Sequence, residues 1–253
     1  MLWVFDLDGV VWLAGQAIPG SPEAVSRLRD QGHRVAFVTN NSTPTVAEYV
    51  ERLAHAGIAI EPEELASSSQ AAATLLEPGQ RVAYVGGEGV REALAGRGVE
   101  LVPAGAGPDA IVVGRSLKLD FDELAAAATA IRNGARFVAT NTDATFPTPH
   151  GPEPGAGALI AYLQVGSGGQ AEVAGKPESP MAELVKERYG QPDVVVGDRA
   201  ETDGDFARRI GAPFALVLTG VTQRGDLPVT PAPALVADNL AEAVKTLLDR
   251  REG

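Results

Sequence analysis

The chain has 253 residues and a formal net charge of −12 at pH 7. This charge disfavours nonspecific binding to nucleic acid or to an anionic membrane surface, because both rely on basic protein surface. The absence of cysteine excludes disulfides and thiolate metal sites. No apolar stretch approaches the roughly 18 residues of a membrane span, and the short apolar start has no basic leader. We therefore expect a cytoplasmic protein with neither nucleic acid nor membrane as a partner.

Short apolar runs alternate with amphipathic segments along the chain, which is typical of parallel βαβ units. Residues 2–5 and 35–38 predict the first strands, and Val46, Val50 and Leu53 mark one face of a following helix. Further strands are expected at residues 82–85, 111–113, 137–139, 194–196, 214–218 and 235–237. Further helices are expected at residues 124–131, from about 179, and at 240–248. The fold class is therefore α/β.

Two turn-forming segments, at residues 77–80 and 166–170, bracket a stretch with strands and helices of its own. We interpret residues 79–170 as an inserted domain, with residues 1–78 and 171–253 forming the domain around it. The alternative is one continuous sheet, which would need about eight parallel strands and would exceed the usual size.

Two acidic segments follow predicted strands. Asp6-Leu7-Asp8-Gly9 comes directly after residues 2–5, and Gly197 to Asp203 follows residues 194–196. Ligands of open α/β sheets bind at the carboxyl ends of the strands, and Gly9 permits the sharp turn that would bring both early carboxylates to that edge. Carboxylates from distant parts of the chain are therefore expected to converge there.

The two acidic segments leave two interpretations open. Asp6, Asp8 and Asp198 would suit Mg²⁺, which takes a few carboxylates and keeps several waters. The alternative for each segment is a solvated turn. A calcium-binding EF-hand is excluded by spacing, because Val11 and Ala17 stand where that loop needs glycine and glutamate.

Two further segments could hold an anion. Thr39-Asn40-Asn41-Ser42 lies between a strand and a helix, where free backbone N–H groups bind anions, although these residue types also serve as plain helix caps. Lys176, within Gly175-Lys176-Pro177, could supply a point charge to phosphate oxygens. A lone lysine is otherwise solvated surface.

Taken together and in this order, the four motifs make the chain resemble the haloacid dehalogenase superfamily. The resemblance is to its type IIA phosphatases, which include nitrophenyl-phosphatase-like, phosphoglycolate and pyridoxal phosphatases. It covers nearly the whole chain, and the segments 139–143, 154–159 and 218–222 are also typical of that group. The resemblance implies a Rossmann-like doubly wound parallel-sheet core with an inserted α/β cap domain of type C2 at residues 79–170.

The resemblance also implies a mechanism. Asp6 would be the nucleophile that forms an aspartyl phosphate, and Asp8 would act as acid and then as base. The metal would be Mg²⁺, held by Asp6, by Asp198 and by the backbone carbonyl of Asp8. Asp203 would orient the metal ligands or bind the metal through a water molecule.

By the same resemblance, other polar residues would bind phosphate or shape the pocket. Thr39, Asn40 and Lys176 would hold the phosphoryl oxygens, and Asn41 would line the same pocket. In the cap, Asn141 and Asp143 are weaker candidates, and their alternative is an Asx-rich turn after the strand at 137–139.

The expected activity is Mg²⁺-dependent hydrolysis of a small phosphorylated metabolite, such as a glycerol phosphate, phosphoglycolate or a sugar phosphate. Phe146 stands where pyridoxal phosphatases carry histidine, which disfavours pyridoxal phosphate. A phosphotransferase or mutase on the same scaffold is the alternative enzyme. A catalytically idle metabolite-binding protein is the alternative from another class. The resemblance further implies that the cap can mediate a homodimer.

Overall fold

The computed structural model describes residues 1–13, 15–148 and 150–252. Contacts divide the chain into two compact units. Unit 1 contains Met1–Thr39, Ala47–Ala66 and Ala182–Gly253, and unit 2 contains Asn40–Val46 and Ser67–Met181. An inserted domain at residues 79–170 stays a prediction.

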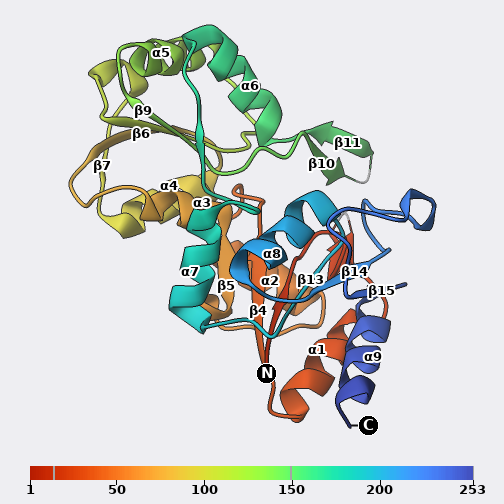
Figure 1. Ribbon diagram of the computed structural model, residues 1–253. Helices are drawn as coiled ribbons and strands as arrows, with labels where there is room; N and C mark the ends of the chain where they lie inside the picture. The colour runs from red at the N-terminus through yellow and green to blue at the C-terminus, as the bar shows by residue number, and fades with distance from the viewer. Residues whose placement is uncertain (14, 149, 253) are drawn as a thin grey trace. The chain divides into compact units, whose positions relative to one another are not determined.

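The sheet of unit 1 has the strand order β15-β14-β13-β1-β4-β5 (Figure 1). The pairs β1–β4, β1–β13, β13–β14 and β14–β15 are all parallel. In this sheet β1 lies between β4 and β13, so Trp3 pairs with both Val35 and Val194. Every residue of β1, β13 and β14 is buried, as expected for a parallel sheet covered on both faces. The strands are β1 (Leu2–Phe5), β4 (Arg34–Thr39), β5 (Leu65–Ser67), β13 (Val194–Gly197), β14 (Phe214–Val217) and β15 (Leu235–Ala237).

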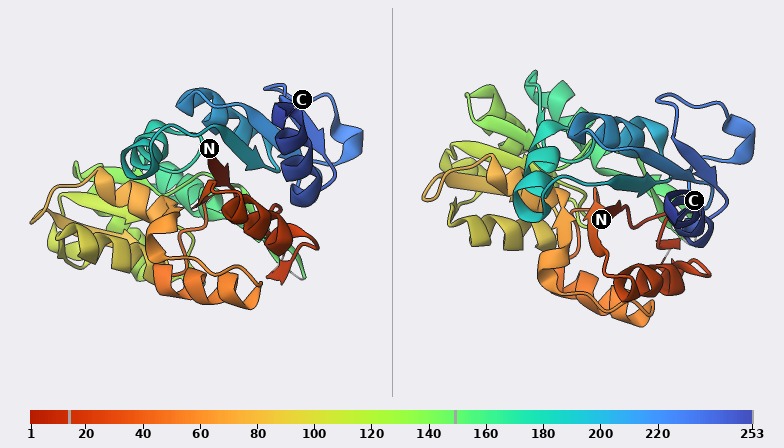
Figure 2. Two further views of the ribbon diagram at one scale, coloured as in Figure 1. Left: turned by 90° about the horizontal axis from the view of Figure 1, so that it is seen from below. Right: turned by 60° about the horizontal axis from the view of Figure 1, so that its bottom comes forward.

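Helices follow these strands along the chain, and α1 packs beside α9 (Figures 1 and 2). Asn239 caps α9 as its sequence predicts, because its Oδ1 accepts a hydrogen bond from the backbone N–H of Glu242 at 3.0 Å. The helices are α1 (Ser21–Asp30), α2 (Val46–His55), α7 (Ser179–Tyr189), α8 (Asp205–Ile210) and α9 (Leu240–Glu252), with short turns η1 (Pro62–Glu64), η3 (Ala200–Gly204) and η4 (Arg224–Asp226).

Unit 2 has a second parallel sheet, in the order β12-β9-β8-β6-β7. Leu124 and Ile131 of α5 and Leu163 of α6 are buried in the same cluster as Ile111 of β8, so both helices contribute to its core. The strands are β6 (Arg81–Val85), β7 (Glu100–Leu101), β8 (Ala110–Val113), β9 (Arg136–Ala139) and β12 (Glu172–Val173). The helices are α3 (Ser68–Thr74), α4 (Glu88–Arg97), η2 (Ala104–Ala106), α5 (Phe121–Arg132) and α6 (Ala156–Ser167).

The strands expected from apolar runs are present, and they divide between the two sheets. A single continuous sheet is therefore wrong, and the α/β class with a parallel-sheet core is confirmed. Two hairpins were not expected: β2 (Trp12–Leu13) with β3 (Gln16–Ala17), and β10 (Thr145–Thr148) with β11 (Gly151–Pro154). Within the described ranges, no helix has the length and apolar character needed to cross a membrane.

Candidate active site

The chain turns sharply after β1. Asp6 continues the sheet for one more hydrogen bond, from its N–H to the carbonyl oxygen of Val196 at 3.0 Å. Gly9 then adopts a φ of 86°, the left-handed conformation that an L side chain rarely takes, so the sharp turn expected there is confirmed. The Gly9 N–H donates to the carbonyl oxygen of Trp12 at 2.7 Å, and Thr219 Oγ1 donates to the Gly9 carbonyl oxygen at 2.5 Å.

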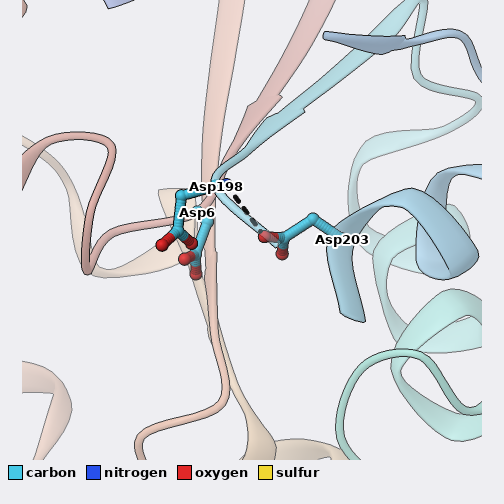
Figure 3. Close-up of side chains that lie close together, drawn as sticks. All are labelled: Asp6, Asp198 and Asp203. Carbon is cyan, nitrogen blue, oxygen red and sulfur yellow. Dashed lines mark hydrogen bonds between the residues drawn. The ribbon is translucent and has the colours of Figure 1, made fainter. Parts of the chain in front are cut away.

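Three carboxylates gather where β1 and β13 end (Figure 3). Asp6, Asp198 and Asp203, here called the acidic group, each contribute an oxygen, and these oxygens lie within 4.8 Å of one another. Asp198 and Asp203 are buried, with 2% and 1% of their surface exposed. The convergence of distant carboxylates predicted from strand ends is therefore present in unit 1.

Asp203 supports the backbone that carries Asp198. The π-helical turn η3 aims its carboxylate back at the end of β13, where Oδ2 accepts hydrogen bonds from the N–H groups of Asp198 at 3.1 Å and Arg199 at 3.2 Å. Figure 3 shows the first of these as a dashed line. Asp203 thus orients the segment that presents Asp198.

The Asp198 carboxylate fits between two glycines. A Cβ added at Gly220 would lie 1.9 Å from Asp198 Oδ2, and one added at Gly9 would lie 2.6 Å from the same atom. Real Cβ atoms do not approach that closely, so both positions need glycine. The Val221 N–H donates to Asp198 Oδ2 at 2.5 Å. Backbone on two sides therefore fixes the direction of this carboxylate.

The acidic group has the chemistry of a site for a hard divalent cation. Like charges this close repel one another, and a bound cation relieves that repulsion. Carboxylate oxygens are the ligands that Mg²⁺ and Ca²⁺ take. The Asp8 side chain is not part of the group, and its Oδ1 accepts a hydrogen bond from Trp12 Nε1 at 3.0 Å. Metal binding by the Asp8 carbonyl stays a prediction.

Two aromatic side chains lie near Asp8 in unit 1, and one of them contacts Thr39. The rings of Trp12 and Tyr49 are stacked, with centroids 6.4 Å apart and planes 4° from parallel. Burial raises the pKa of the Tyr49 hydroxyl well above its usual value, the negative charge of Asp8 adds to the rise, and a hydrogen bond with Thr39 opposes it. Tyr49 is therefore neutral at physiological pH and serves Thr39 as a hydrogen-bonding partner.

Unit 2 brings a second set of the predicted residues together around Asn40. Its Oδ1 accepts from the backbone N–H of Lys176 at 2.8 Å, and its Nδ2 donates to the Lys176 carbonyl oxygen at 3.0 Å. The same Nδ2 lies 3.2 Å from Asp143 Oδ1. Asn40 and Lys176 are both buried, which is unusual for a lysine. The Asn40 side chain therefore fixes the backbone of Lys176.

The backbone of Asn40 is held as well. Its carbonyl oxygen accepts from Asn141 Nδ2 at 2.6 Å and from Ser68 Oγ at 2.5 Å. We call Asn40, Ser68, Asn141, Asp143 and Lys176 the Asn40 network. The expected Asx turn is also present, because the Asp143 N–H donates to Asn141 Oδ1 at 3.1 Å.

Asn41 lies beside this network and makes a local turn. Its Oδ1 accepts a hydrogen bond from the N–H of Thr43 at 3.1 Å. This is the Asx-turn bond that short polar side chains make with backbone two residues on. Its role in lining a phosphate pocket stays a prediction.

Three residues near the site, Trp12, Tyr49 and Ser68, were not singled out from the sequence, and Gly220 was noted only as part of segment 218–222. Trp12 and Tyr49 read as core, because one belongs to an apolar run and the other to an amphipathic helix. Ser68 sits in a serine run that looks like a helix start. The signal for Gly220 was its place next to threonine after a predicted strand, which is weak by itself.

A parallel α/β sheet with an acidic group at the carboxyl ends of its strands has the arrangement of α/β proteins that bind ligands at that edge. A family profile described as haloacid dehalogenase-like hydrolase matches residues 3–100, and one described as HAD-hydrolase-like matches residues 173–243. The chain belongs to the haloacid dehalogenase-like hydrolases, in their type IIA group of phosphatases, so the predicted membership is confirmed.

Three known proteins illustrate the relationship. The D-glycerol 3-phosphate phosphatase of Mycobacterium tuberculosis is 38% identical over 229 residues, which are 88% of this chain and 64% of that protein. The 5′-nucleotidase YutF of Bacillus subtilis is 34% identical over 88% of each chain. A crystal structure of the M. tuberculosis glycerol phosphate phosphatase in complex with magnesium has a TM-score of 0.89 and 35% identity, covering 96% of this chain and 75% of that one.

Proposed function

We propose that this chain is a cytoplasmic, Mg²⁺-dependent phosphomonoester hydrolase that acts on a small phosphorylated metabolite through an aspartyl phosphate. The observation that carries the proposal is the acidic group, whose oxygens lie within 4.8 Å of one another beside the turn that follows Asp6. The relatives named as phosphatases of glycerol phosphate and of nucleotides support the substrate class. The relative solved with magnesium supports the metal.

Two carboxylates would divide the chemistry. An Asp6 oxygen attacks phosphorus, the bond from phosphorus to the alcohol oxygen breaks, and Asp8 gives that oxygen a proton. Asp8 then takes a proton from the water that attacks the aspartyl phosphate, which releases inorganic phosphate and restores Asp6. Mg²⁺, held by Asp6, Asp198 and the Asp8 carbonyl, would stabilise charge on the transferring phosphoryl group.

Neutral donors and one lysine would hold the phosphoryl oxygens. We assign this role to Thr39, Asn40 and Lys176, with Asn41 lining the pocket. Phosphoryl transfer depends mainly on positioning and charge stabilisation, and the hydrogen bonds from the Asn40 side chain suit that need because they fix the backbone that carries Lys176. Asn141 and Asp143 would help to shape the pocket from the cap.

We assign residues 79–170 to the cap, which would select the leaving group, and residues 1–78 and 171–253 to the catalytic core. We also propose that the cap mediates a homodimer. This is supported by large apolar side chains exposed on unit 2 at Leu117, Leu119, Phe121, Tyr162 and Val165. Light scattering of the purified protein tests the dimer, and a monomer at micromolar concentration would contradict it.

The first test is hydrolysis of p-nitrophenyl phosphate with and without Mg²⁺. We expect activity that requires Mg²⁺, and a loss of about 10⁴-fold or more in kcat for Asp6→Asn, because removal of a nucleophile eliminates the covalent route. Asp249→Asn, which changes an exposed carboxylate of α9, serves as the matched control. Metal-independent activity in the wild type, or full activity in Asp6→Asn, would refute the mechanism.

The substrate class is tested by comparing kcat/KM among phosphorylated metabolites, since specificity is a ratio of these values. Glycerol 3-phosphate and nucleoside 5′-monophosphates come first, because relatives are named for such substrates. Pyridoxal phosphate is the expected poor substrate, since Phe146 replaces the histidine of pyridoxal phosphatases.

A further inference from the structure

We propose that Trp12 is a positioning residue whose indole N–H holds the Asp8 carboxyl group in the orientation from which it protonates the leaving group. The inference rests on the proposed role of Asp8 as general acid. It assigns a task to a residue that the mechanism above does not use.

The contact that carries the proposal is a hydrogen bond between two side chains four residues apart. Trp12 Nε1 donates to Asp8 Oδ1 at 3.0 Å. A hydrogen bond from a fixed N–H to one carboxyl oxygen restricts rotation of the carboxyl group and leaves the other oxygen to carry the proton. The side chain of Asp8 therefore has one oxygen committed to a fixed donor.

The backbone between the two residues is fixed at both ends, which makes the donor rigid. The Trp12 N–H donates to the Leu7 carbonyl oxygen at 3.2 Å, while the Trp12 carbonyl oxygen accepts from Gly9 N–H at 2.7 Å. These bonds close the turn that Gly9 allows, and they place Asp8 and Trp12 in a β-bridge.

The indole ring itself has little freedom. Trp12 is 5% exposed, and its ring stacks on Tyr49, which is 1% exposed and comes from α2. An aromatic ring packed in this way adopts one rotamer, so the N–H is aimed before any substrate arrives. Preorganisation of this kind is what a general acid requires, because proton transfer depends on geometry first.

The other tryptophan of the chain offers an internal contrast. Trp3 in β1 is fully buried, yet among the described residues its Nε1 has no hydrogen-bond partner. Its contribution is therefore packing alone. Both tryptophans belong to unit 1, so replacement of each by phenylalanine removes the same atoms and differs in the loss of the bond to Asp8.

A misplaced acid has a recognisable kinetic effect. Phenolate leaves poorly without a proton, whereas p-nitrophenolate is a stabilised anion that leaves with little help. Loss of general-acid orientation should therefore slow hydrolysis of phenyl phosphate more than that of p-nitrophenyl phosphate. A loss of folded protein lowers both rates equally, so the ratio of the two kcat/KM values isolates the effect.

The experiment compares wild type, Trp12→Phe, Trp12→Met and Trp3→Phe with both substrates at saturating Mg²⁺. For Trp12→Phe and Trp12→Met we expect kcat/KM for phenyl phosphate to fall about 10-fold relative to p-nitrophenyl phosphate, which is the upper scale for the loss of one neutral hydrogen bond. Trp3→Phe should keep the wild-type ratio. Equal losses for both substrates, no loss, or the same shift in Trp3→Phe would overturn the proposal.

Failure of the proposed function gives a different result. Asp8→Asn should itself lower the phenyl phosphate rate relative to the p-nitrophenyl phosphate rate. If it does not, Asp8 is not the acid and the mechanism is wrong. If Asp8→Asn shifts the ratio and the Trp12 variants do not, the role of Trp12 alone is refuted.

Discussion

The acidic group of unit 1 and the Asn40 network of unit 2 are both polar and mostly buried, but they are stabilised in opposite ways. In the acidic group, three carboxylates with like charge are held near one another by backbone contacts. In the Asn40 network, the side-chain amides of Asn40 and Asn141 pair with backbone groups and with the carboxylate of Asp143. The carboxylates of the acidic group therefore repel one another, whereas the side-chain amides of the Asn40 network have hydrogen-bond partners within the network.

This difference separates two requirements of one reaction. A site that must attract a cation gains from uncompensated negative charge. This charge destabilises the folded protein, and a bound cation stabilises it again. A site for phosphoryl oxygens gains from donors whose geometry is set beforehand. Perturbing each group should therefore have distinct consequences for stability and for response to Mg²⁺.

The largest expected effect is on stability, from Asn40→Ala. The change removes three hydrogen bonds made by the side chain and leaves buried partners behind. At about 1 kcal/mol each, we expect a loss of about 3 kcal/mol in the free energy of unfolding, measured by urea denaturation. The loss should be the same with and without Mg²⁺. Asn133→Ala, at an exposed position after α5, is the control.

A smaller and metal-dependent effect is expected from Gly220→Ala. The new Cβ would collide with Asp198 Oδ2 and displace the carboxylate. We expect a stability loss of about 1–3 kcal/mol from overpacking and Mg²⁺ activation that needs about 10–100 times more metal. Gly225→Ala, where a Cβ meets no atom within 4 Å, is the matched control. An unchanged Mg²⁺ activation curve in Gly220→Ala would show that Asp198 does not bind the metal.

The smallest effect concerns the wild type itself. Mg²⁺ should slow amide hydrogen exchange at Asp198, Arg199 and Val221, whose N–H groups bond to carboxylates of the acidic group. We expect exchange at these three sites to slow about 10-fold when the Mg²⁺ concentration is in modest excess over its Kd. Exchange at Lys176, whose N–H bonds to Asn40, should not respond. Equal slowing at both places would remove the contrast between the two groups.

Apolar runs predicted β1, β13 and β14 well because all their residues are buried and none of them is charged. The equally long strands β10 and β11 carry no such signal. Strand β11 reads Gly-Pro-Glu-Pro and β10 contains a proline, a residue that cannot donate to a ladder, so its hairpin was not expected.

The candidate site was predicted to the extent that its residues follow strands. Asp6, Asp198 and Asn40 could be found because they stand where strands end. The hydrogen bond from Trp12 to Asp8 could not, because it depends on a turn that reverses the chain within four residues. The support from Asp203 depends on a π-helical turn, which sequence patterns do not indicate.

The position of β1 has a consequence for how the protein is made. The Leu2 N–H donates to Asp193 Oδ2 at 2.8 Å, although these residues are 191 positions apart in the chain. On the ribosome β1 can pair with β4 early, but its other edge must wait for β13. Contacts this distant in sequence slow folding and leave a strand edge exposed to aggregation meanwhile. The acidic group therefore assembles late, after most of the chain has been synthesised.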